Sequence, residues 1–221
     1  MCINMISILM PIYNGIEFID VSVSSILQQT YADWELIIGI NGHPEGSIVY
    51  DKAKEFEKQS GKIHVYDFHK LKGKSVTLNE MVKLCKYEWI SLLDVDDKWL
   101  PEKLEKQVPY MGTHDVIGTQ CQYFGDINSI PNIPLGDLSG LDFRKVNPII
   151  NSSCLIKKSV AYWDKLFDGV EDYELWLKLW TQKKSFFNVP DVLVLHRIHR
   201  DSAFNAKGNN NKLGKLLELY K

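Results

Sequence analysis

Three aspartates, Asp94, Asp96 and Asp97, stand within four residues directly after the apolar run at residues 89–93. Carboxylates this close repel one another, and a divalent cation placed among them offsets the repulsion. Oxygen ligands suit Mg²⁺ and Mn²⁺, which commonly share their coordination shell with substrate phosphates. The cluster therefore indicates a metal and phosphate site. Because Asp also caps the first turn of helices, a solvated helix start explains the cluster about equally well.

A second acidic pair, Glu171 and Asp172, opens a segment with helical periodicity at residues 171–182. Aromatic and apolar side chains follow on one face of that predicted helix, which is the pattern of a helix packed on a core. Acids in the first turn are favoured by the helix dipole alone. A structural role for the pair and a chemical role are both open on these grounds.

The elements that must position these carboxylates alternate between strand and helix in the first half of the chain. Apolar runs predict strands at residues 6–10, 34–40, 63–68 and 89–93, and periodic patterns predict helices at 16–27, 47–58, 76–85 and from Pro101. Such alternation predicts an α/β fold with a mostly parallel, Rossmann-like sheet flanked by helices. Ligands bind beyond the carboxyl ends of the strands in these sheets, which is where the three aspartates fall.

The second half of the chain is less regular and predicts a smaller, mixed region. A Gly- and Pro-rich stretch at residues 124–140 predicts a loop, and strands are expected at 149–156 and 192–196. A short amphipathic helix is predicted at the end of the chain, after a segment at 199–212 that we expect to be mobile. The loop at 124–140 and that segment are candidates to close over a site.

Bulk composition limits the classes of function. The chain has 221 residues, of which 45% are hydrophobic, and a net charge of -2. One large domain is expected over residues 1–221, and the charge balance argues against a nucleic-acid binder. No apolar run approaches the ~18 residues of a transmembrane helix, and no secretory signal is evident. These features predict a cytoplasmic protein and leave peripheral membrane attachment and oligomer formation open.

The order of the motifs resembles that of the family 2 glycosyltransferases, small inverting enzymes with the GT-A fold that use nucleotide sugars. The resemblance runs from about Ser7 to His199. It rests on the segments "PIYN" at 11–14, "GKSVTLN" at 73–79, "LDVDDKWLP" at 93–101, "EDYELW" at 171–176 and "HRIH" at 196–199. Several separated motifs in family order are far more specific than any one of them.

The resemblance implies roles for individual residues. Asp96 is the expected main ligand of Mn²⁺ or Mg²⁺, His199 can reach the metal or the diphosphate, and Asp172 is the expected general base. Glu171, Trp99 and Trp176 are expected to position the site or the acceptor, although both tryptophans also suit a core. The expected nucleotide-binding residues are Pro11, Tyr13, Asn14, Asn41, Lys74, Asn79 and Asp94, with Tyr13 against the base and Pro11 shaping its turn.

One segment departs from the family pattern. Family members usually carry an Asp-Asp-Gly-Ser-like turn after the second strand, and its first Asp contacts the base. Here the segment "GINGHPEGS" at residues 39–47 places Ile40 and Asn41 at those positions. Asn can hydrogen-bond a nucleobase and Ile cannot, so a changed mode of base recognition is expected.

The resemblance predicts an enzyme that moves a sugar from a nucleoside-diphosphate donor to an acceptor hydroxyl with inversion. A UDP-sugar is the favoured donor, with GDP- or dTDP-sugars as alternatives, and the acceptor is a glycan, lipid or protein-linked hydroxyl. Residues 1–120 would bind the donor and residues 121–221 the acceptor. Two alternatives remain: a catalytically silent nucleotide-sugar-binding module, and a nucleotidyltransferase or phosphatase on a similar sheet. A haloacid-dehalogenase-type phosphatase fits poorly, because its acidic motif follows the first strand and not the fourth.

Overall fold

Nine strands form one sheet in the computed structural model, which describes residues 5–199 and 209–221. The strands are β1 (Ile6–Ile12), β2 (Trp34–Asn41), β3 (Ile63–Phe68), β4 (Trp89–Leu92), β5 (Lys98–Trp99), β6 (Val116–Gly125), β7 (Gly136–Asp137), β8 (Leu155–Lys157) and β9 (Phe186–Ile198). Their order is β3-β2-β1-β4-β8-β6-β9-β5, and β7 pairs with β9. Strands from both halves of the chain therefore share one sheet.

The sheet changes character where the two halves of the chain meet. β3, β2, β1 and β4 run parallel, as the strand and helix alternation predicts. β8 joins them antiparallel to β4, and beyond it the pairings are mixed: β6 is antiparallel to β8 and parallel to β9. The predicted α/β fold, with a mostly parallel sheet and a smaller mixed region, is confirmed.

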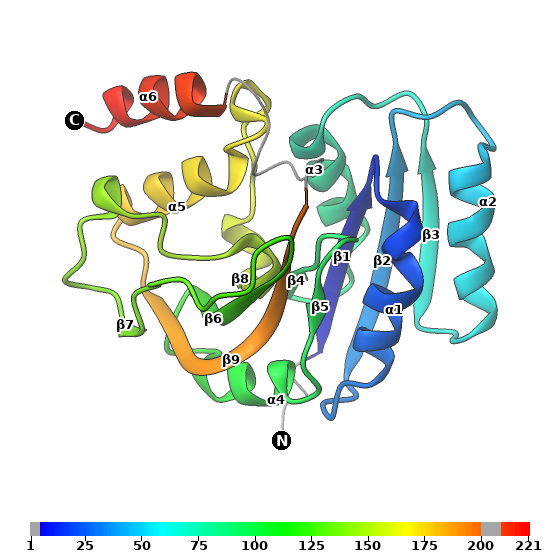
Figure 1. Cartoon of the computed structure of the whole chain (residues 1–221), viewed down its shortest axis with the longest axis horizontal. Helices are drawn as coiled ribbons and strands as arrows, with labels where there is room; N and C mark the ends of the chain where they lie inside the picture. Colours follow the sequence, from blue (N-terminus) through cyan, green and yellow to red (C-terminus); the bar gives the residue numbers. More distant parts are fainter. Residues whose placement is uncertain (1–4, 200–208) are drawn as a thin grey trace.

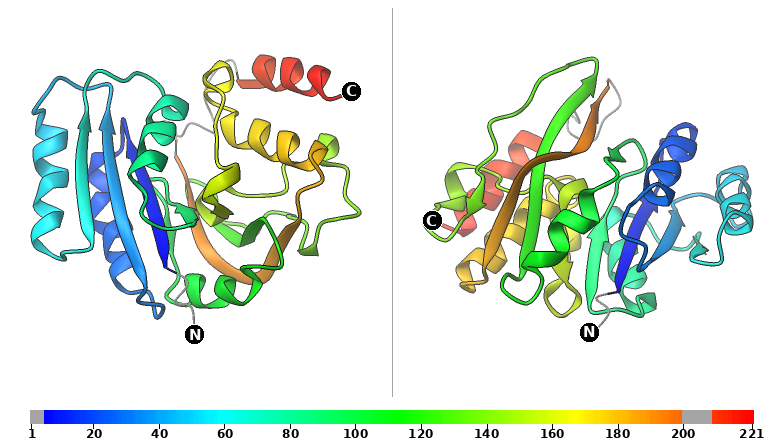
Figure 2. Two further views of the ribbon diagram at one scale, coloured as in Figure 1. Left: turned by 180° about the vertical axis from the view of Figure 1, so that it is seen from behind. Right: turned by 90° about the horizontal axis from the view of Figure 1, so that it is seen from below.

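Helices cover both faces of the sheet (Figures 1 and 2). The helices are α1 (Ile19–Leu27), α2 (Ile48–Lys54), α3 (Lys74–Leu84), α4 (Lys103–Gln107), α5 (Glu171–Thr181) and α6 (Asn209–Leu219). α1, α2 and α4 pack on one face, while α3, α5 and α6 pack on the other. Within the described part of the chain, no helix combines the length and the apolar character that a membrane crossing requires.

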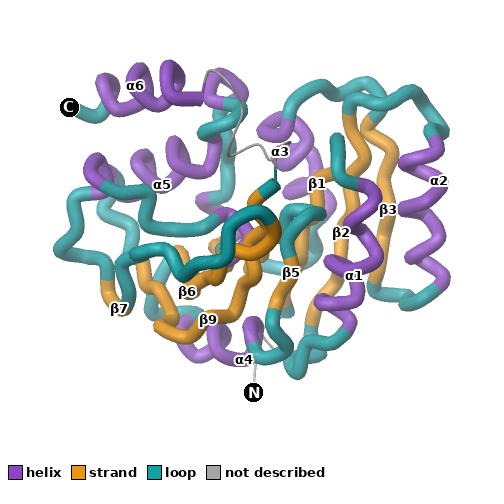
Figure 3. Tube along the Cα trace, viewed as in Figure 1, coloured by secondary structure: helices purple, strands orange, loops and turns teal. Residues whose placement is uncertain are grey.

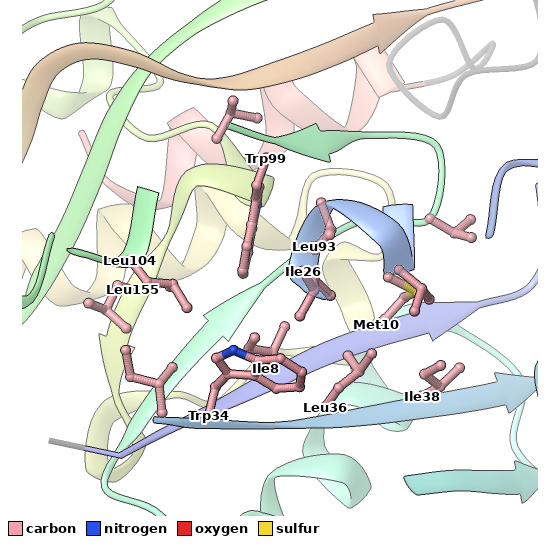
Figure 4. Close-up of a cluster of buried hydrophobic side chains, with 14 of the residues drawn as sticks. Ile8, Met10, Ile26, Trp34, Leu36, Ile38, Leu93, Trp99, Leu104 and Leu155 are labelled. Carbon is pink, nitrogen blue, oxygen red and sulfur yellow. The ribbon is translucent and has the colours of Figure 1, made fainter. Parts of the chain in front are cut away.

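The sheet has a hydrophobic core on each face. Alternate residues of a strand contribute to one core or the other, because successive side chains of a strand point to opposite faces. Ile8 and Met10 of β1 lie in the core beneath α1, whereas Leu9 between them faces α3 and α5. Figure 4 shows the first of these cores, with Ile26 of α1 above the strands and Trp34 at one end. Burying apolar surface at about 25 cal/mol per Å² is the main term that holds these layers together.

The periodicity of the sequence predicted most helices and strands of the first half of the chain. It predicted fewer in the second half, which is rich in loops (Figure 3). The strand predicted at residues 149–156 is wrong over much of its length: Asn151–Ser153 forms a 3-10 turn, and β8 begins only at Leu155. Asn and Ser side chains favour turns because they bond to the nearby backbone. The strand predicted at 192–196 is the last part of the 13-residue β9, and β6 was not predicted.

A buried lysine packs between the sheet and α4. Lys103 has no exposed surface, and its Nζ donates to Ser91 Oγ at 3.1 Å and to Gln107 Oε1 at 2.8 Å. The same Nζ lies 3.9 Å from the centre of the Trp99 ring, which is a cation–π contact. Burial lowers the pKa of Lys103 to about 7.

We expect this lysine to make stability rise with pH just above neutrality. Folded Lys103 releases its proton near pH 7, while an unfolded lysine holds it to about 10.5, so the unfolded state binds more protons between these values. From pH 7 to 8.5 the free energy of unfolding should rise by roughly 1.5 kcal/mol relative to Lys103→Met. Urea titrations of both proteins across this range measure the difference. Parallel pH profiles for the two proteins would show that Lys103 does not titrate there.

Candidate active site

The acidic cluster forms a tight turn at the carboxyl end of β4, at the same sheet edge as the ends of β1, β2 and β3 (Figure 1). The backbone N–H of Asp97 donates to the carbonyl of Asp94 at 3.0 Å and closes the turn. The three carboxylates then meet three different sets of partners. These partners determine which of the three carboxylates is available to bind a cation.

Asp94 is neutralised from both sides. Lys74 Nζ donates to its Oδ1 at 2.7 Å and Asn151 Nδ2 donates to its Oδ2 at 2.9 Å. Ser152 Oγ accepts from the Asp94 backbone N–H at 3.1 Å. Burial opposes the charge, but Lys74 and Asn151 outweigh it and hold the pKa of Asp94 below its usual value. Asp94 is thus a fixed carboxylate within a polar network.

Asp97 anchors the last strand of the sheet. Its side chain is 1% exposed, His196 Nδ1 lies 2.8 Å from its Oδ2, and the Arg197 backbone N–H donates to its Oδ1 at 2.7 Å. Burial disfavours an imidazolium, yet Asp97 and the neighbouring aspartates raise the pKa of His196 to about 9. A buried carboxylate with both oxygens paired to β9 has a structural role in holding that strand.

Arg197 extends the same anchor. Its guanidinium lies between the rings of Phe18 and Phe124, 4.4 and 4.3 Å from their centres. Its Nε donates to the backbone carbonyl of Asp96 at 2.9 Å. The arginine therefore fixes the backbone of the acidic turn and leaves the Asp96 carboxylate to other partners.

The Asp96 carboxylate carries the least favourable charge of the three. Burial, followed by repulsion from Asp97 and Asp94, raises the pKa of Asp96, and contact with His199 only partly opposes this. His199 Nε2 lies 3.1 Å from Asp96 Oδ2. Among the described residues no group of three or more His, Cys, Asp or Glu side chains is arranged to hold a metal. The pair Asp96–His199 suits Mg²⁺ or Mn²⁺ that takes its remaining ligands from water and substrate phosphates.

The second acidic pair lies on the other side of Lys74. Glu171 Oε1 is 3.5 Å from Lys74 Nζ, and its Oε2 accepts from the Gly169 backbone N–H at 2.6 Å. Asp172 is half-buried, and Asn147 Nδ2 donates to its Oδ2 at 3.4 Å. Burial and the neighbouring Glu171 raise the pKa of Asp172 to about 6, while Lys74 opposes the rise. A carboxylate with this pKa is suited to accept a proton near neutral pH.

Helix α3, which carries Lys74, is fixed by residues far along the chain. Asp168 Oδ1 accepts from the backbone N–H of Ser75 at 2.9 Å and from its hydroxyl at 2.5 Å, and so caps the helix. Gly73 has a φ of 109°, and a Cβ there would lie 2.3 Å from Asp168 Oδ2. Only glycine combines that backbone geometry with so close an approach.

Asn79 on the same helix bonds to the backbone of a distant residue. Its Nδ2 donates to the carbonyl of Trp163 at 2.8 Å, and its Oδ1 accepts from the Trp163 backbone N–H at 3.0 Å. Both ends of the amide are therefore used to tie α3 to residue 163. Asn79 therefore has a structural role in this fold, and its predicted contact with the nucleotide stays a prediction.

The end of β1 presents the predicted base-stacking residue to solvent. Pro11 lies within β1, and Tyr13 and Asn14 just beyond it are exposed, Tyr13 by 57%. The Tyr13 ring lies 5.6 Å from the ring of His43, whose Nε2 contacts the Tyr13 carbonyl. An exposed ring at this sheet edge is available to stack on a base.

The turn after β2 differs from what we expected of it. Asn41 is the last residue of β2 and only 3% exposed, so little of its side chain is available to read a base. Ile40 is paired across the sheet with Asp67 of β3, and Asp67 Oδ2 accepts from the backbone N–H of Gly46 at 2.9 Å. A carboxylate from the neighbouring strand thus organises the turn in which the family's own acid is replaced.

Trp99 and Trp176 are buried, as the expectation that both suit a core requires. Trp99 is 3% exposed and Trp176 is fully buried. Their indole N–H groups donate to the carbonyls of Ser152 at 2.7 Å and of Ile149 at 3.2 Å. The two indoles therefore support the segment at residues 149–152.

Several residues of the site escaped the sequence analysis. They are Asn147, Asn151, Ser152 and Asp168, whose contacts are described above. The polar run "NPIINSS" at residues 147–153 was the available signal for the first three, but the strand predicted at 149–156 covers most of it. Most of the segment predicted to be mobile, at 199–212, falls on residues 200–208 and lies outside the described residues.

Comparison with known proteins identifies the family. The profile described as "Glycosyl transferase family 2" matches residues 7–163. The chain belongs to glycosyltransferase family 2. The O-antigen biosynthesis glycosyltransferase WbnJ of Escherichia coli is 30% identical over 214 residues, which cover 90% of this chain and 82% of WbnJ.

Solved structures of low sequence identity share the fold. Staphylococcus aureus TarS 1–349 in complex with UDP-GlcNAc superposes with a TM-score of 0.78 at 13% identity, over 98% of this chain and 65% of that one. The mannosyltransferase PcManGT of Pyrobaculum calidifontis, in complex with GDP-Man and Mn²⁺, gives a TM-score of 0.69 at 12% identity, over 90% and 58% of the two chains. The family 2 glycosyltransferase with a GT-A fold that the motifs predicted is thereby confirmed.

The cap on α3 can be tested by its effect on stability. Asp168→Ala should lower the free energy of unfolding by about 1–2 kcal/mol, because the first turn of α3 loses its acceptor. Asp164→Ala is the matched control: its Oδ1 accepts only from the Leu166 N–H in a local turn, so a loss below about 0.5 kcal/mol is expected. Denaturant titration measures both. Equal losses would contradict a special role for Asp168.

Proposed function

We propose that this glycosyltransferase moves a sugar from a UDP-sugar to an acceptor hydroxyl, with a divalent metal and with inversion at the anomeric carbon. The observation that carries the proposal is the arrangement around Lys74. On one side lie Asp94 and the pair Asp96–His199, suited to a metal and a diphosphate. On the other side lies the acidic pair Glu171–Asp172, which is suited to accept a proton.

Asp96 and His199 would hold the Mn²⁺ or Mg²⁺ ion. A bound divalent cation supplies positive charge that stabilises the leaving diphosphate. PcManGT, which shares the fold, was solved with GDP-Man and Mn²⁺, and this supports a metal at the equivalent edge of the sheet. Uridine is favoured as the base because TarS, with the higher TM-score of the two, was solved with UDP-GlcNAc.

Asp172 is the proposed general base. As the acceptor oxygen bonds to the anomeric carbon, its O–H bond breaks and Asp172 takes the proton. The bond from that carbon to the diphosphate breaks on the opposite face, and its electron pair leaves with the phosphate oxygen. One displacement with one base inverts the anomeric centre. Lys74 favours the charged form of this base, whereas Glu171 raises its pKa to a value suited to proton transfer near neutral pH.

We propose that the two halves of the chain bind different substrates. Residues 1–120, with Tyr13 exposed at the end of β1, would bind the nucleotide. Residues 121–221 would bind the acceptor, which we expect to be a hydroxyl on a glycan, lipid or protein-linked chain. The loop at 124–140 is a candidate to cover the acceptor, since Ile127 and Ile130 are more than half exposed. We propose a cytoplasmic location.

Loss of the metal ligand should weaken nucleotide binding only when metal is present. For Asp96→Ala, we expect the affinity for UDP in the presence of Mn²⁺ to fall by roughly 10-fold or more, the scale of one lost charged contact. Without Mn²⁺ the variant and the wild type should bind UDP alike. Asp20→Ala, on the exposed surface of α1, is the control. Calorimetric titration with a circular dichroism check of folding measures this, and unchanged Mn²⁺-dependent binding would remove Asp96 from the metal site.

Loss of the base should slow transfer strongly while sparing donor binding. Asp172→Asn is nearly isosteric, so stability and donor affinity should stay near wild type while kcat falls by roughly 10²-fold or more. Glu171→Gln should be milder. Because the pKa of Asp172 is about 6, wild-type kcat/KM should fall as pH drops through that value, when the base becomes protonated.

Transfer assays on both variants from pH 5 to 8 test whether Asp172 is the general base. The limb near pH 6 should be missing from the residual activity of Asp172→Asn. Full turnover by that variant would rule out Asp172 as the base. Turnover by neither variant nor wild type, with donor still bound, would favour a silent nucleotide-sugar-binding module.

A further inference from the structure

A buried acceptor without a partner lies next to the acidic turn. Asn151 Oδ1 is inaccessible to solvent and makes no hydrogen bond within the described part of the chain. Buried polar atoms are nearly always paired, so such an atom beside a candidate active site requires an explanation. The explanation depends first on which end of the amide faces Asp94.

The surroundings fix the orientation of that amide. Lys74 donates to one oxygen of Asp94, so the other oxygen belongs to a carboxylate and can only accept. Asn151 must therefore turn its N–H₂ group to Asp94 Oδ2, at 2.9 Å. Its carbonyl oxygen is then left as an acceptor. Rotating the amide to satisfy that oxygen would break the bond to Asp94.

The backbone that carries Asn151 is held on all sides. The indoles of Trp99 and Trp176 donate to the carbonyls of Ser152 and Ile149, on either side of it. The Cys154 backbone N–H donates to the Asn151 carbonyl at 3.1 Å. The segment then enters β8, which pairs with β4, the strand that ends at the acidic turn. Asn151 Oδ1 is thus presented by a rigid support, as binding groups usually are.

The same segment serves both acidic clusters. Asn151 donates to Asp94 on the metal side, and Asn147, four residues earlier, donates to Asp172 on the base side. A donor sugar undergoing transfer must lie between a diphosphate on the first side and an acceptor hydroxyl on the second. Residues 147–152 therefore run along the position that the sugar of the donor would occupy.

We propose that Asn151 Oδ1 accepts a hydrogen bond from a hydroxyl of the donor's sugar, and that Asn151 thereby helps to select the donor. This inference rests on the proposed function, because it requires a nucleotide sugar at this edge of the sheet. A hydroxyl is the matching group: it can donate to Oδ1 and at the same time accept from a neighbouring donor such as Lys74. The hydroxyl belongs either to the transferred sugar or to the ribose.

A double-mutant cycle between protein and ligand tests the proposal. Wild type and Asn151→Ala are titrated with UDP-glucose, with UDP-glucose analogues lacking one glucose hydroxyl each, and with UDP and 2′- and 3′-deoxy-UDP, all with Mn²⁺. For wild type, removing the recognised hydroxyl should weaken binding by roughly 10-fold, because a buried acceptor loses its partner. For Asn151→Ala, removing the same hydroxyl should cost almost nothing.

The cycle separates recognition from support of Asp94. Asn151→Ala also removes the bond to Asp94, but that loss weakens every ligand alike and cancels in the comparison. Asn147→Ala is the matched control, since it removes the other amide of the segment and should show no such coupling. Coupling to a glucose hydroxyl places Asn151 at the transferred sugar, and coupling to a ribose hydroxyl places it at the nucleoside.

The remaining outcomes are decisive as well. If wild type binds UDP-glucose and no hydroxyl couples to Asn151, the inference is wrong and the proposed function stands. If UDP-glucose fails to bind, UDP-galactose, UDP-GlcNAc and GDP-mannose are titrated, and the cycle is run on the donor that binds. If wild type binds none of these donors with Mn²⁺, the proposed function is wrong and the inference falls with it.

Discussion

Lys74 is the charge on which the rest of the site depends. Its Nζ lies 2.7 Å from Asp94 and 3.5 Å from Glu171, so one cation serves acidic groups from two distant parts of the chain. Burial works against that charge, but Asp94, Glu171 and Asp172 raise the pKa of Lys74 and keep it protonated. Without it, carboxylates on both sides would face one another across a poorly hydrated space, at a cost of several kcal/mol per uncompensated ion.

The three clustered aspartates show how identical side chains acquire different tasks. Asp97 is buried against His196 and holds β9, Asp94 is bound by Lys74 and Asn151, and Asp96 keeps an unfavourable charge beside His199. The three carboxylates differ in their hydrogen-bonding and charged partners, and these partners come from different parts of the chain. An acidic motif thus tells where charge is concentrated, while the packing around it decides which oxygen remains reactive.

The sequence predicted the helices and strands whose formation depends on the periodicity of neighbouring side chains. Strands β1 to β4 and helices α1, α3 and α5 follow from alternating and helical periodicity, and the acidic residues were placed correctly at the ends of their elements. The partners of those residues could not be predicted this way. Asn151 and Asp94 are 57 positions apart and Asp168 and Ser75 are 93 apart, so their contacts depend on β8 lying next to β4. The sequence also left a core role and an acceptor role open for Trp99 and Trp176, because nearness to a motif in sequence does not distinguish a site from the core beneath it.

The pairing of β8 with β4 has a consequence for how the protein is made. While the first 120 residues leave the ribosome, β4 has a neighbour on one side only, and α3 lacks the carboxylate that caps it. An apolar strand with an open edge is a template for pairing with other chains. These two contacts form only after residues 155–168 have been synthesised, and contacts of such long sequence separation form slowly. The nascent chain therefore passes through an interval of exposure to aggregation, which makes it a natural client for chaperones.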